Sequence, residues 1–161
     1  MMPVLRLVQL VLAALLSLHA LLIAFTNLTD YRVNFEFLRM VAGMSDTYSA
    51  QKTWRSVSNP ALLHGMYLLI IAAEATSGVL CGLGAWRMWN NRLAPDILFE
   101  AGKQTAVKGA LTGVALWFGA LLTISGEWFL MWQSKTWNAT STAVSLAVFY
   151  SIALSVLLKK D

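Results

Sequence analysis

The chain has 161 residues, of which 58% are hydrophobic and 12% are charged, with a mean hydropathy of +0.62 and a formal net charge of +4. A soluble domain of this length needs about twice that charged fraction to cover its surface. The composition therefore excludes an ordinary soluble domain and predicts a membrane protein. Its positive charge is expected to favour anionic lipid headgroups rather than nucleic acid.

One crossing of the hydrocarbon core takes about 20 apolar residues. Four runs of this kind are present, at residues 4–25, 61–86, 106–129 and 139–158. Together they use more than half of the chain, which leaves no room for a separate soluble domain. The sequence therefore predicts a single transmembrane domain over residues 1–161, an all-α membrane protein with a four-transmembrane-helix bundle.

The first run could be taken for a signal peptide, because Arg6 precedes its apolar stretch. That stretch is about 19 residues long, whereas the apolar part of a cleaved signal usually has about 7 to 15. We therefore expect the run to be retained as a membrane span.

The large outer loop between the first two spans covers residues 26–60. Thr29 or Asp30 is placed to cap a short helix there. Apolar residues that recur at helical spacing follow: Phe35, Leu38 and Val41 or Ala42. Such a segment is expected to lie on the membrane surface or to cover the end of the bundle.

Two further short elements are expected in the loops. Trp54 and Arg55 belong to a second turn of the outer loop, and Pro60 is favoured as the first residue of the next helix. The polar inner loop, residues 90–105, contains a start signal for a brief amphipathic helix at residues 96–102.

Lys and Arg are enriched in cytoplasmic loops, so their distribution predicts the orientation. With four spans, one side holds Arg6, Arg87, Arg92, Lys103, Lys108, Lys159 and Lys160, and the other holds Arg32, Arg39, Lys52, Arg55 and Lys135. The first set is larger and lies closer to the span ends. Both termini are therefore expected in the cytoplasm. Tryptophans form belts at both surfaces: Trp86 and Trp89 inside, and Trp128, Trp132 and Trp137 outside.

Small residues four apart allow helices to approach closely. Gly78 and Gly82 in the second span, and Gly109 and Gly113 in the third, favour packing between helices of one chain, with a homo-oligomer as the alternative. Cys81 is the single cysteine, so no intramolecular disulfide forms, and it is expected to be a small packing residue.

Glu74 lies near the middle of the second span, where an isolated ionised side chain costs a few kcal/mol. It must be protonated, paired or hydrated. Polar groups expected at its depth are Thr76, Ser77, Tyr150 and Ser151. The favoured interpretation is a neutral Glu74 that clamps helices by a hydrogen bond; a proton relay, an ion site and contact with a partner's polar group remain as alternatives.

The third span ends in Gly-Glu-Trp-Phe-Leu-Met-Trp-Gln-Ser, residues 126–134. Trp128 and Trp132 are spaced to share one helix face. Glu127 is expected to form an interface pair with a basic group, with Arg55 favoured over Lys135 and His64. The predicted outer-interface patch consists of Glu127, Trp128, Trp132, Gln133, Trp54 and Arg55, with Tyr31, Phe35 and Phe37 as further exposed anchors.

His19 and His64 are both expected in the outer half of the bilayer, where two helices could ligate a haem. Hydrogen-bonded or interfacial histidines are the favoured interpretation, and no cofactor is expected. The sequence has no zinc-spaced cluster, phosphate-binding glycine loop or nucleophile elbow, so neither a metal site nor a catalytic residue is predicted. Asn27 and Asn138 each begin a glycosylation sequon, a pattern with many false positives.

Residues spread over nearly the whole chain carry a resemblance to a known family. In chain order they are Asn27, Thr29-Asp30-Tyr31, Asn34-Phe35, Trp54-Arg55, Pro60, Tyr67, Glu74, residues 126–134 and Trp137-Asn138. This order resembles the bacterial family of predicted small integral membrane proteins called domain of unknown function 2165. The resemblance implies four spans, a bacterial inner-membrane location and no particular activity.

Two classes of function follow. The favoured one is a non-enzymatic accessory subunit that binds another membrane or periplasmic protein through the outer loop and the Trp-rich interface. The alternative is a small proton- or ion-coupled transporter or channel that uses Glu74, and a haem-binding subunit is a weaker third. Four spans with one central carboxylate offer little to form an aqueous path, which is why the first is favoured.

Overall fold

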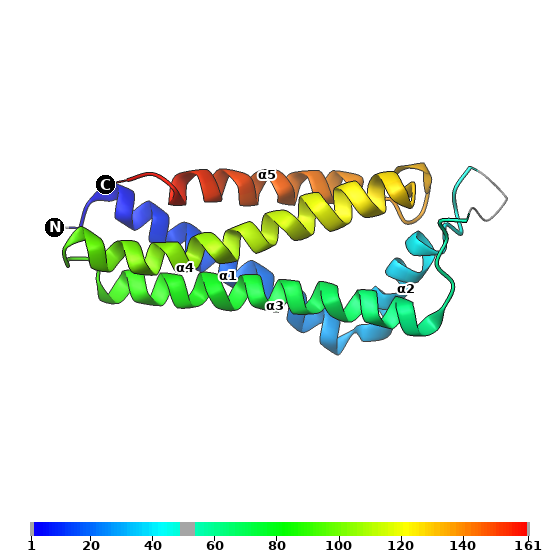
Figure 1. Ribbon diagram of the computed structural model, residues 1–161, viewed down its shortest axis with the longest axis horizontal. Helices are drawn as coiled ribbons and strands as arrows, with labels where there is room; N and C mark the ends of the chain where they lie inside the picture. The colour runs from blue at the N-terminus through cyan, green and yellow to red at the C-terminus, as the bar shows by residue number, and fades with distance from the viewer. Residues whose placement is uncertain (1, 49–53, 161) are drawn as a thin grey trace.

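The computed structural model describes residues 2–48 and 54–160, and all the regular elements within them are helical (Figure 1). In chain order they are α1 (Val4–Thr29), α2 (Tyr31–Ala42), α3 (Pro60–Asn90), α4 (Asp96–Val114), the π-helix η1 (Ala115–Trp128), the 3₁₀ turn η2 (Met131–Gln133) and α5 (Thr140–Leu157). Lys52, which entered the charge comparison, lies outside the described residues.

Within the described residues, four helical segments are long and apolar enough to cross a membrane: α1, α3, α4 continued by η1, and α5. This confirms the predicted all-α fold with four spans. The two termini lie at the same end of the molecule, as an even number of crossings requires (Figure 1). We call that end the inner end and the opposite one the outer end.

Alanines are numerous in the core, whereas many large apolar residues lie on the surface. Buried positions include Ala13, Ala20, Ala106, Ala110 and Ala143, and exposed ones include Leu22, Leu69, Phe118, Phe149 and Ile152. A soluble protein has the reverse distribution, because water drives its large apolar side chains inward. Lipid does not, so helices associate through close backbone approach between small residues.

The glycine pairs pack within one chain, as favoured from the sequence. A Cβ on Gly78 would lie 2.7 Å from Leu21 Cγ on α1, and one on Gly109 would lie 2.7 Å from the backbone N of Cys81 on α3. Cys81 is itself fully buried at this contact, which confirms its packing role. The glycines are therefore used to bring α1, α3 and α4 together.

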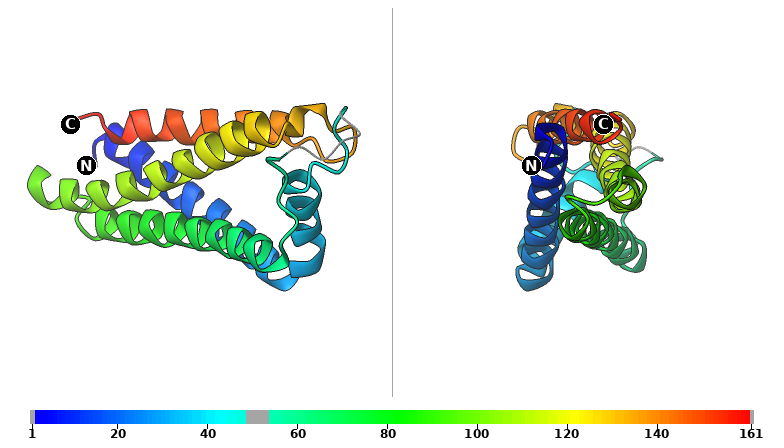
Figure 2. Two further views of the ribbon diagram at one scale, coloured as in Figure 1. Left: turned by 45° about the vertical axis from the view of Figure 1, so that its right-hand side comes forward. Right: turned by 90° about the vertical axis from the view of Figure 1, so that its left-hand side faces the viewer.

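The short helix predicted in the outer loop is present as α2. It runs across the outer end, between the α1–α3 pair and the η1–α5 pair, and so covers the end of the bundle (Figure 2). Asp30 is the N-cap residue of α2, as one of the two predicted candidates, but its side chain makes no capping hydrogen bond. Thr29 is instead the last residue of α1, and its hydroxyl donates to Phe25 O.

The starts of α3 and α4 agree with the sequence signals, but the inner loop between them is shorter than predicted. Pro60 begins α3, and the side chain of Asn59 accepts hydrogen bonds from the N–H groups of the first turn. The expected inner loop of residues 90–105 is much shorter, because α4 starts at Asp96 and continues without a break into the span. The predicted brief helix is thus the first turns of the third span.

Candidate functional site

Glu74 lies in the middle of α3 with 3% of its surface exposed. Its partner is the side-chain amide of Asn27 on α1, whose Nδ2 donates to both carboxylate oxygens at 3.0 and 2.8 Å. Thr76, Ser77, Tyr150 and Ser151 were predicted as hydrogen-bond partners of Glu74, and this prediction was wrong. The hydroxyl of Ser77, for example, donates to Gly109 O on α4 instead.

The antiparallel packing of α1 on α3 brings Asn27 to this depth. Along this contact, a Cβ added at Gly82 would meet Ser17 Oγ, and one added at Gly78 would meet Leu21. Asn27 follows in the same register and lies level with Glu74. The first span was predicted to end at residue 25, whereas α1 continues to Thr29, so sequence reasoning placed Asn27 outside the span.

A cavity of about 190 Å³ lies beside the Glu74 carboxylate. All four helices around it contribute side chains, among them Asn27 of α1, Asn34 of α2, Tyr67 of α3 and Trp117 of η1. The Tyr67 hydroxyl is already used, because it donates to Asn27 O at 3.1 Å. This cavity is the one place in the described core where a carboxylate, amides and aromatic rings surround open space.

Tyr150 is buried in the core, where its ring lies against the bare backbone of Gly113 on α4. Its hydroxyl is 3.4 Å from His19 Nδ1, and the His19 ring lies 6.3 Å from that of Trp117, centroid to centroid. Tyr150 was predicted to be a polar group inside the membrane, and it is a polar residue of the core. Its hydroxyl lies near His19 rather than near Glu74.

His64 belongs to a different cluster at the outer end. Its Nδ1 lies 2.8 Å from the Tyr31 hydroxyl, and its ring stacks on Phe35 at a centroid distance of 4.2 Å. His64 therefore has its ring contacts with α2, whereas those of His19 are with η1 and α5. The structure does not bring the two histidines to one pocket, so the geometry offers no haem-ligating pair.

Three predicted surface anchors point inward instead. Tyr31 and Phe35 pack on Tyr67, and Phe37 lies against Trp137. The helical spacing predicted α2, but its apolar face is used to cover the bundle.

The segment of residues 126–134 is an ordered turn. The helix ends at Trp128, and Leu130 adopts a left-handed conformation with φ 56°. Phe129 and Met131 are buried against α2 and the start of α3. The prediction that Trp128 and Trp132 share one helix face is therefore wrong, because the helix ends between them.

Asp46 holds the second half of this turn. Its Oδ2 accepts hydrogen bonds from Ser134 Oγ at 2.9 Å and from the backbone N–H groups of Lys135 and Thr136, each at 3.1 Å. The Ser134 hydroxyl in turn accepts from the N–H of Trp137 at 2.7 Å. One carboxylate thus fixes the loop between the third and fourth spans to the loop that follows α2.

These hydrogen bonds, that of Ser134 first, lower the pKa of Asp46 below its ordinary value. A carboxylate with a lowered folded-state pKa stabilises the fold above the unfolded-state pKa, and this contribution is lost as pH falls through the folded-state value. We therefore expect Asp46→Asn to lower the melting temperature at pH 6, and the difference from wild type to shrink below about pH 4. A difference that is the same at pH 6 and pH 3 would contradict this role for the charge.

The outward side of the same loops carries exposed aromatic residues. The Trp54 and Trp128 rings meet edge to face at 5.4 Å, and those of Tyr48 and Trp132 at 6.4 Å. The backbone N–H of Tyr48 donates to Gln133 Oε1 at 3.3 Å. We call this set the outer aromatic surface: Tyr48, Trp54, Trp128 and Trp132, with Arg55 and Gln133.

The expected pair between Glu127 and Arg55 is not formed. The Arg55 guanidinium lies over the Trp128 ring, 5.8 Å from its centroid. Glu127 is exposed, and within the described part of the chain it makes no ion pair with Arg55, Lys135 or His64. A cation over an indole face is a favourable contact, so Arg55 stabilises the aromatic surface rather than a carboxylate.

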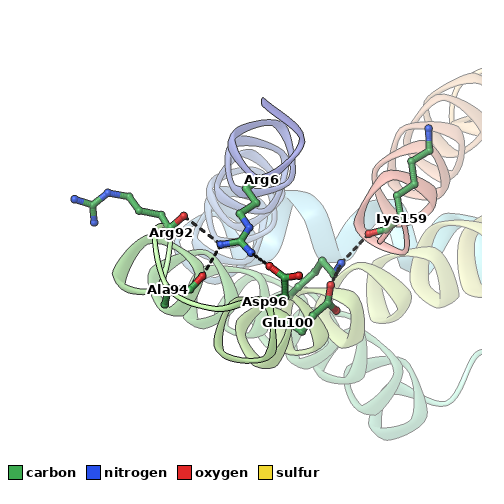
Figure 3. A network of polar contacts seen from close by, with 7 residues as sticks. Arg6, Arg92, Ala94, Asp96, Glu100 and Lys159 are labelled. Carbon is green, nitrogen blue, oxygen red and sulfur yellow. Dashed lines mark hydrogen bonds and ion pairs between the residues drawn. The ribbon is translucent and has the colours of Figure 1, made fainter. Parts of the chain in front are cut away.

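Buried cations close the inner end (Figure 3). Arg6 donates to the carbonyls of Arg92 and Ala94 and pairs with Asp96. Lys103, with 1% of its surface exposed, pairs with Glu100 and donates to Lys159 O at 2.7 Å. The last bond places a positive charge at the carboxyl end of α5, where the helix dipole favours it. These contacts join the two termini to the α3–α4 turn.

Sequence reasoning missed two residues of this arrangement. Asn27 carried one available signal, since it is an amide within a long apolar helix, but it was interpreted as part of a sequon. Asp46 carried none, because its role depends on a loop 88 residues further along the chain. Among residues 2–48 and 54–160, no three His, Cys, Asp or Glu side chains gather in a group that could hold a metal ion.

No curated protein and no solved structure gives a significant match to this chain. A family model described as predicted small integral membrane protein (DUF2165) matches residues 5–160. That range includes all four spans, the Asn27–Glu74 pair and the turn that Asp46 fixes. The chain therefore belongs to the DUF2165 family of predicted small integral membrane proteins.

Proposed function

We propose that this protein is a non-enzymatic accessory subunit that docks to another membrane or periplasmic protein through its outer aromatic surface. The observation that carries the proposal is the contrast between the two sides of the outer loops. Their inner side is fixed by Phe129, Met131 and the Asp46 hydrogen bonds, whereas their outer side leaves Trp54 85% exposed. The sequence supports the non-enzymatic part, because it contains no recognisable catalytic motif.

Residue type and rigidity both favour docking. Trp, Tyr and Arg contribute most of the binding energy in many protein interfaces, and this surface is built from them. Binding also costs less free energy when the interacting loops are already ordered before the partner arrives. Trp128 and Trp132 lie on the ordered turn, and Trp54 packs edge to face against Trp128, so this surface meets both conditions.

The proposed location is a bacterial inner membrane with both termini in the cytoplasm, so that the outer aromatic surface faces the periplasm. The excess of Lys and Arg near the inner span ends supports this orientation. A carboxyl-terminal green fluorescent protein fusion is then expected to fluoresce and an alkaline phosphatase fusion to be inactive. The reverse pair of results would overturn the orientation.

The docking proposal is tested with tryptophans at the two ends of the bundle. Trp54→Ala and Trp132→Ala are expected to reduce the amount of a co-purifying protein by tenfold or more, since interface aromatics often contribute about 2 kcal/mol or more. Quantitative mass spectrometry after purification in mild detergent measures it. Trp86→Ala is the matched control, because Trp86 is exposed at the inner end.

Melting temperatures of the same purified variants separate docking from structural support. Docking predicts wild-type melting for Trp54→Ala and Trp132→Ala. If these variants melt several degrees lower, the tryptophans support the fold. If Trp86→Ala releases the same protein, the tryptophans act as general membrane-interface anchors. Either result means that the docking proposal is wrong.

The alternative, a proton- or ion-coupled transporter that uses Glu74, has less support. Between Glu74 and the inner end, the described core is closed by fully buried side chains: Ser77, Cys81, Met88, Phe99 and Leu157. The open space next to Glu74 is a cavity in the outer half of the bundle that adjoins a groove on its side, and not a path along the axis of the bundle. A haem-binding role has still less support, because the two histidines lie in separate clusters.

A further inference from the structure

The cavity beside Glu74 combines one acidic group with several aromatic rings. Glu74 reaches it from α3, and the rings of Phe37, Tyr67 and Trp117 come from α2, α3 and η1. None of the described residues that line it is a Lys or Arg. The site thus offers a carboxyl group and aromatic rings, and no cationic side chain that would neutralise an anion.

The Glu74 carboxylate has unused hydrogen-bonding capacity. An ionised carboxylate offers about four acceptor sites, and the Asn27 amide is its hydrogen-bond donor within the described residues. A neutral carboxyl group would need an acceptor for its own proton, and Asn27 presents its N–H groups to both oxygens. The ion pairs found in the described chain join other residues: Arg6 with Asp96, Arg39 with Glu36, and Lys103 with Glu100. Within the described residues, the Glu74 carboxyl group thus has one amide partner, free acceptor capacity and no cationic partner.

The aromatic walls indicate which kind of cation fits. Aromatic faces attract ammonium groups through the ring quadrupole, and cages of several rings recognise quaternary ammonium ligands. Ammonium groups are also less strongly hydrated when alkyl groups surround the nitrogen, so their transfer into a low-dielectric cavity costs less than that of a small metal ion. Asn34 and Ser125 add amide and hydroxyl groups to the same wall.

An apolar groove leads from this cavity to the lipid-facing surface. The groove has a volume of about 370 Å³ and lies between α3 and η1 under α2. It shares Leu38, Ile70 and Ser125 with the cavity, so the two are adjacent. Its outer edge includes Leu69, 71% exposed on the surface that faces lipid. A molecule with its charged group at Glu74 would have its alkyl chain in this groove.

We propose that the Glu74 cavity is a binding site for an ammonium-headed amphiphile that enters from the bilayer between α3 and η1. The ammonium group lies between the Glu74 carboxylate and the rings of Tyr67 and Trp117, and a single alkyl chain occupies the groove. This site is separate from the outer aromatic surface, so it stands or falls independently of the docking proposal.

The probe for the test is octyltrimethylammonium, which is measured by calorimetric titration into the protein in a neutral maltoside detergent. Octanesulfonate has the same chain with the opposite charge and is the comparison ligand. Wild-type protein is expected to bind the ammonium compound saturably and at least tenfold more tightly than the sulfonate. Glu74→Gln is expected to weaken ammonium binding at least tenfold, whereas Glu127→Gln, which removes an exposed carboxylate, leaves it unchanged.

Ser125→Leu is the second variant, because it fills the junction between cavity and groove and leaves Glu74 in place. It is expected to weaken binding of the ammonium compound at least tenfold, and it decides the outcome if Glu74→Gln does not fold. Equal binding of sulfonate and ammonium, or wild-type ammonium binding by Glu74→Gln or Ser125→Leu, would overturn the proposal. An equal loss in Glu127→Gln would also overturn it, since the effect would then be general surface charge.

Discussion

Gly84→Ala is expected to lower the free energy of unfolding by about 3 kcal/mol, because an added methyl group in a closely packed core forces neighbouring backbone apart. A Cβ at Gly84 would lie 2.5 Å from the backbone N of Ala106 and 2.7 Å from its Cβ. A flexible side chain could move away, but the backbone of α4 moves only as a whole helix. The expected loss is measured by reversible unfolding in mixed detergent micelles.

Gly65→Ala is the matched control in the same helix. Outside its own helix turn, no atom lies within 4 Å of a Cβ added at Gly65, so this substitution is expected not to destabilise the protein and to gain up to about 1 kcal/mol from helix propensity. If both substitutions have equally small effects, close approach of α3 and α4 at Gly84 does not stabilise the bundle.

Asn27→Leu is expected to destabilise the protein by about 3 kcal/mol, more than Glu74→Leu does. Removal of the amide leaves a buried carboxylate without a donor, and an unpaired buried charge costs more than an unpaired buried amide. Glu74→Leu leaves the Asn27 amide unpaired, with an expected loss of about 1–3 kcal/mol. Glu74→Gln should lose the least stability, because the side-chain oxygen of glutamine still accepts a hydrogen bond from the Asn27 amide.

The double variant tests whether the two side chains act as a pair. Asn27→Leu combined with Glu74→Leu should lose less stability than the sum of the single losses, by about 0.5–3 kcal/mol. Unfolding measurements on the four proteins give this coupling energy. Additive losses, or a Glu74→Leu that is worse than Asn27→Leu, would show that the amide does not stabilise an ionised Glu74.

Local patterns in the sequence were sufficient for the fold class. Runs of about 20 apolar residues are long enough to cross a bilayer whatever their neighbours are, which is why four spans followed from the sequence. The spacing of Leu38 and Val41 predicted α2, and Pro60 marked the start of α3, because both signals act within one or two turns. Gly78 and Gly109 indicated close helix packing for a similar reason, since a missing side chain allows close approach with any neighbour.

The partners of the polar residues were decided by the tertiary structure. Which group faces Glu74 depends on the register and rotation of α1 against α3, and sequence spacing within one helix carries no information on either. The same holds for Asp46, which fixes a turn 88 residues away in the chain, and for Arg55, which lies over Trp128 instead of pairing with Glu127. Apolar burial is non-directional and follows from composition, whereas a hydrogen bond requires two groups to meet within about 3 Å. Only the relative placement of the helices meets that requirement.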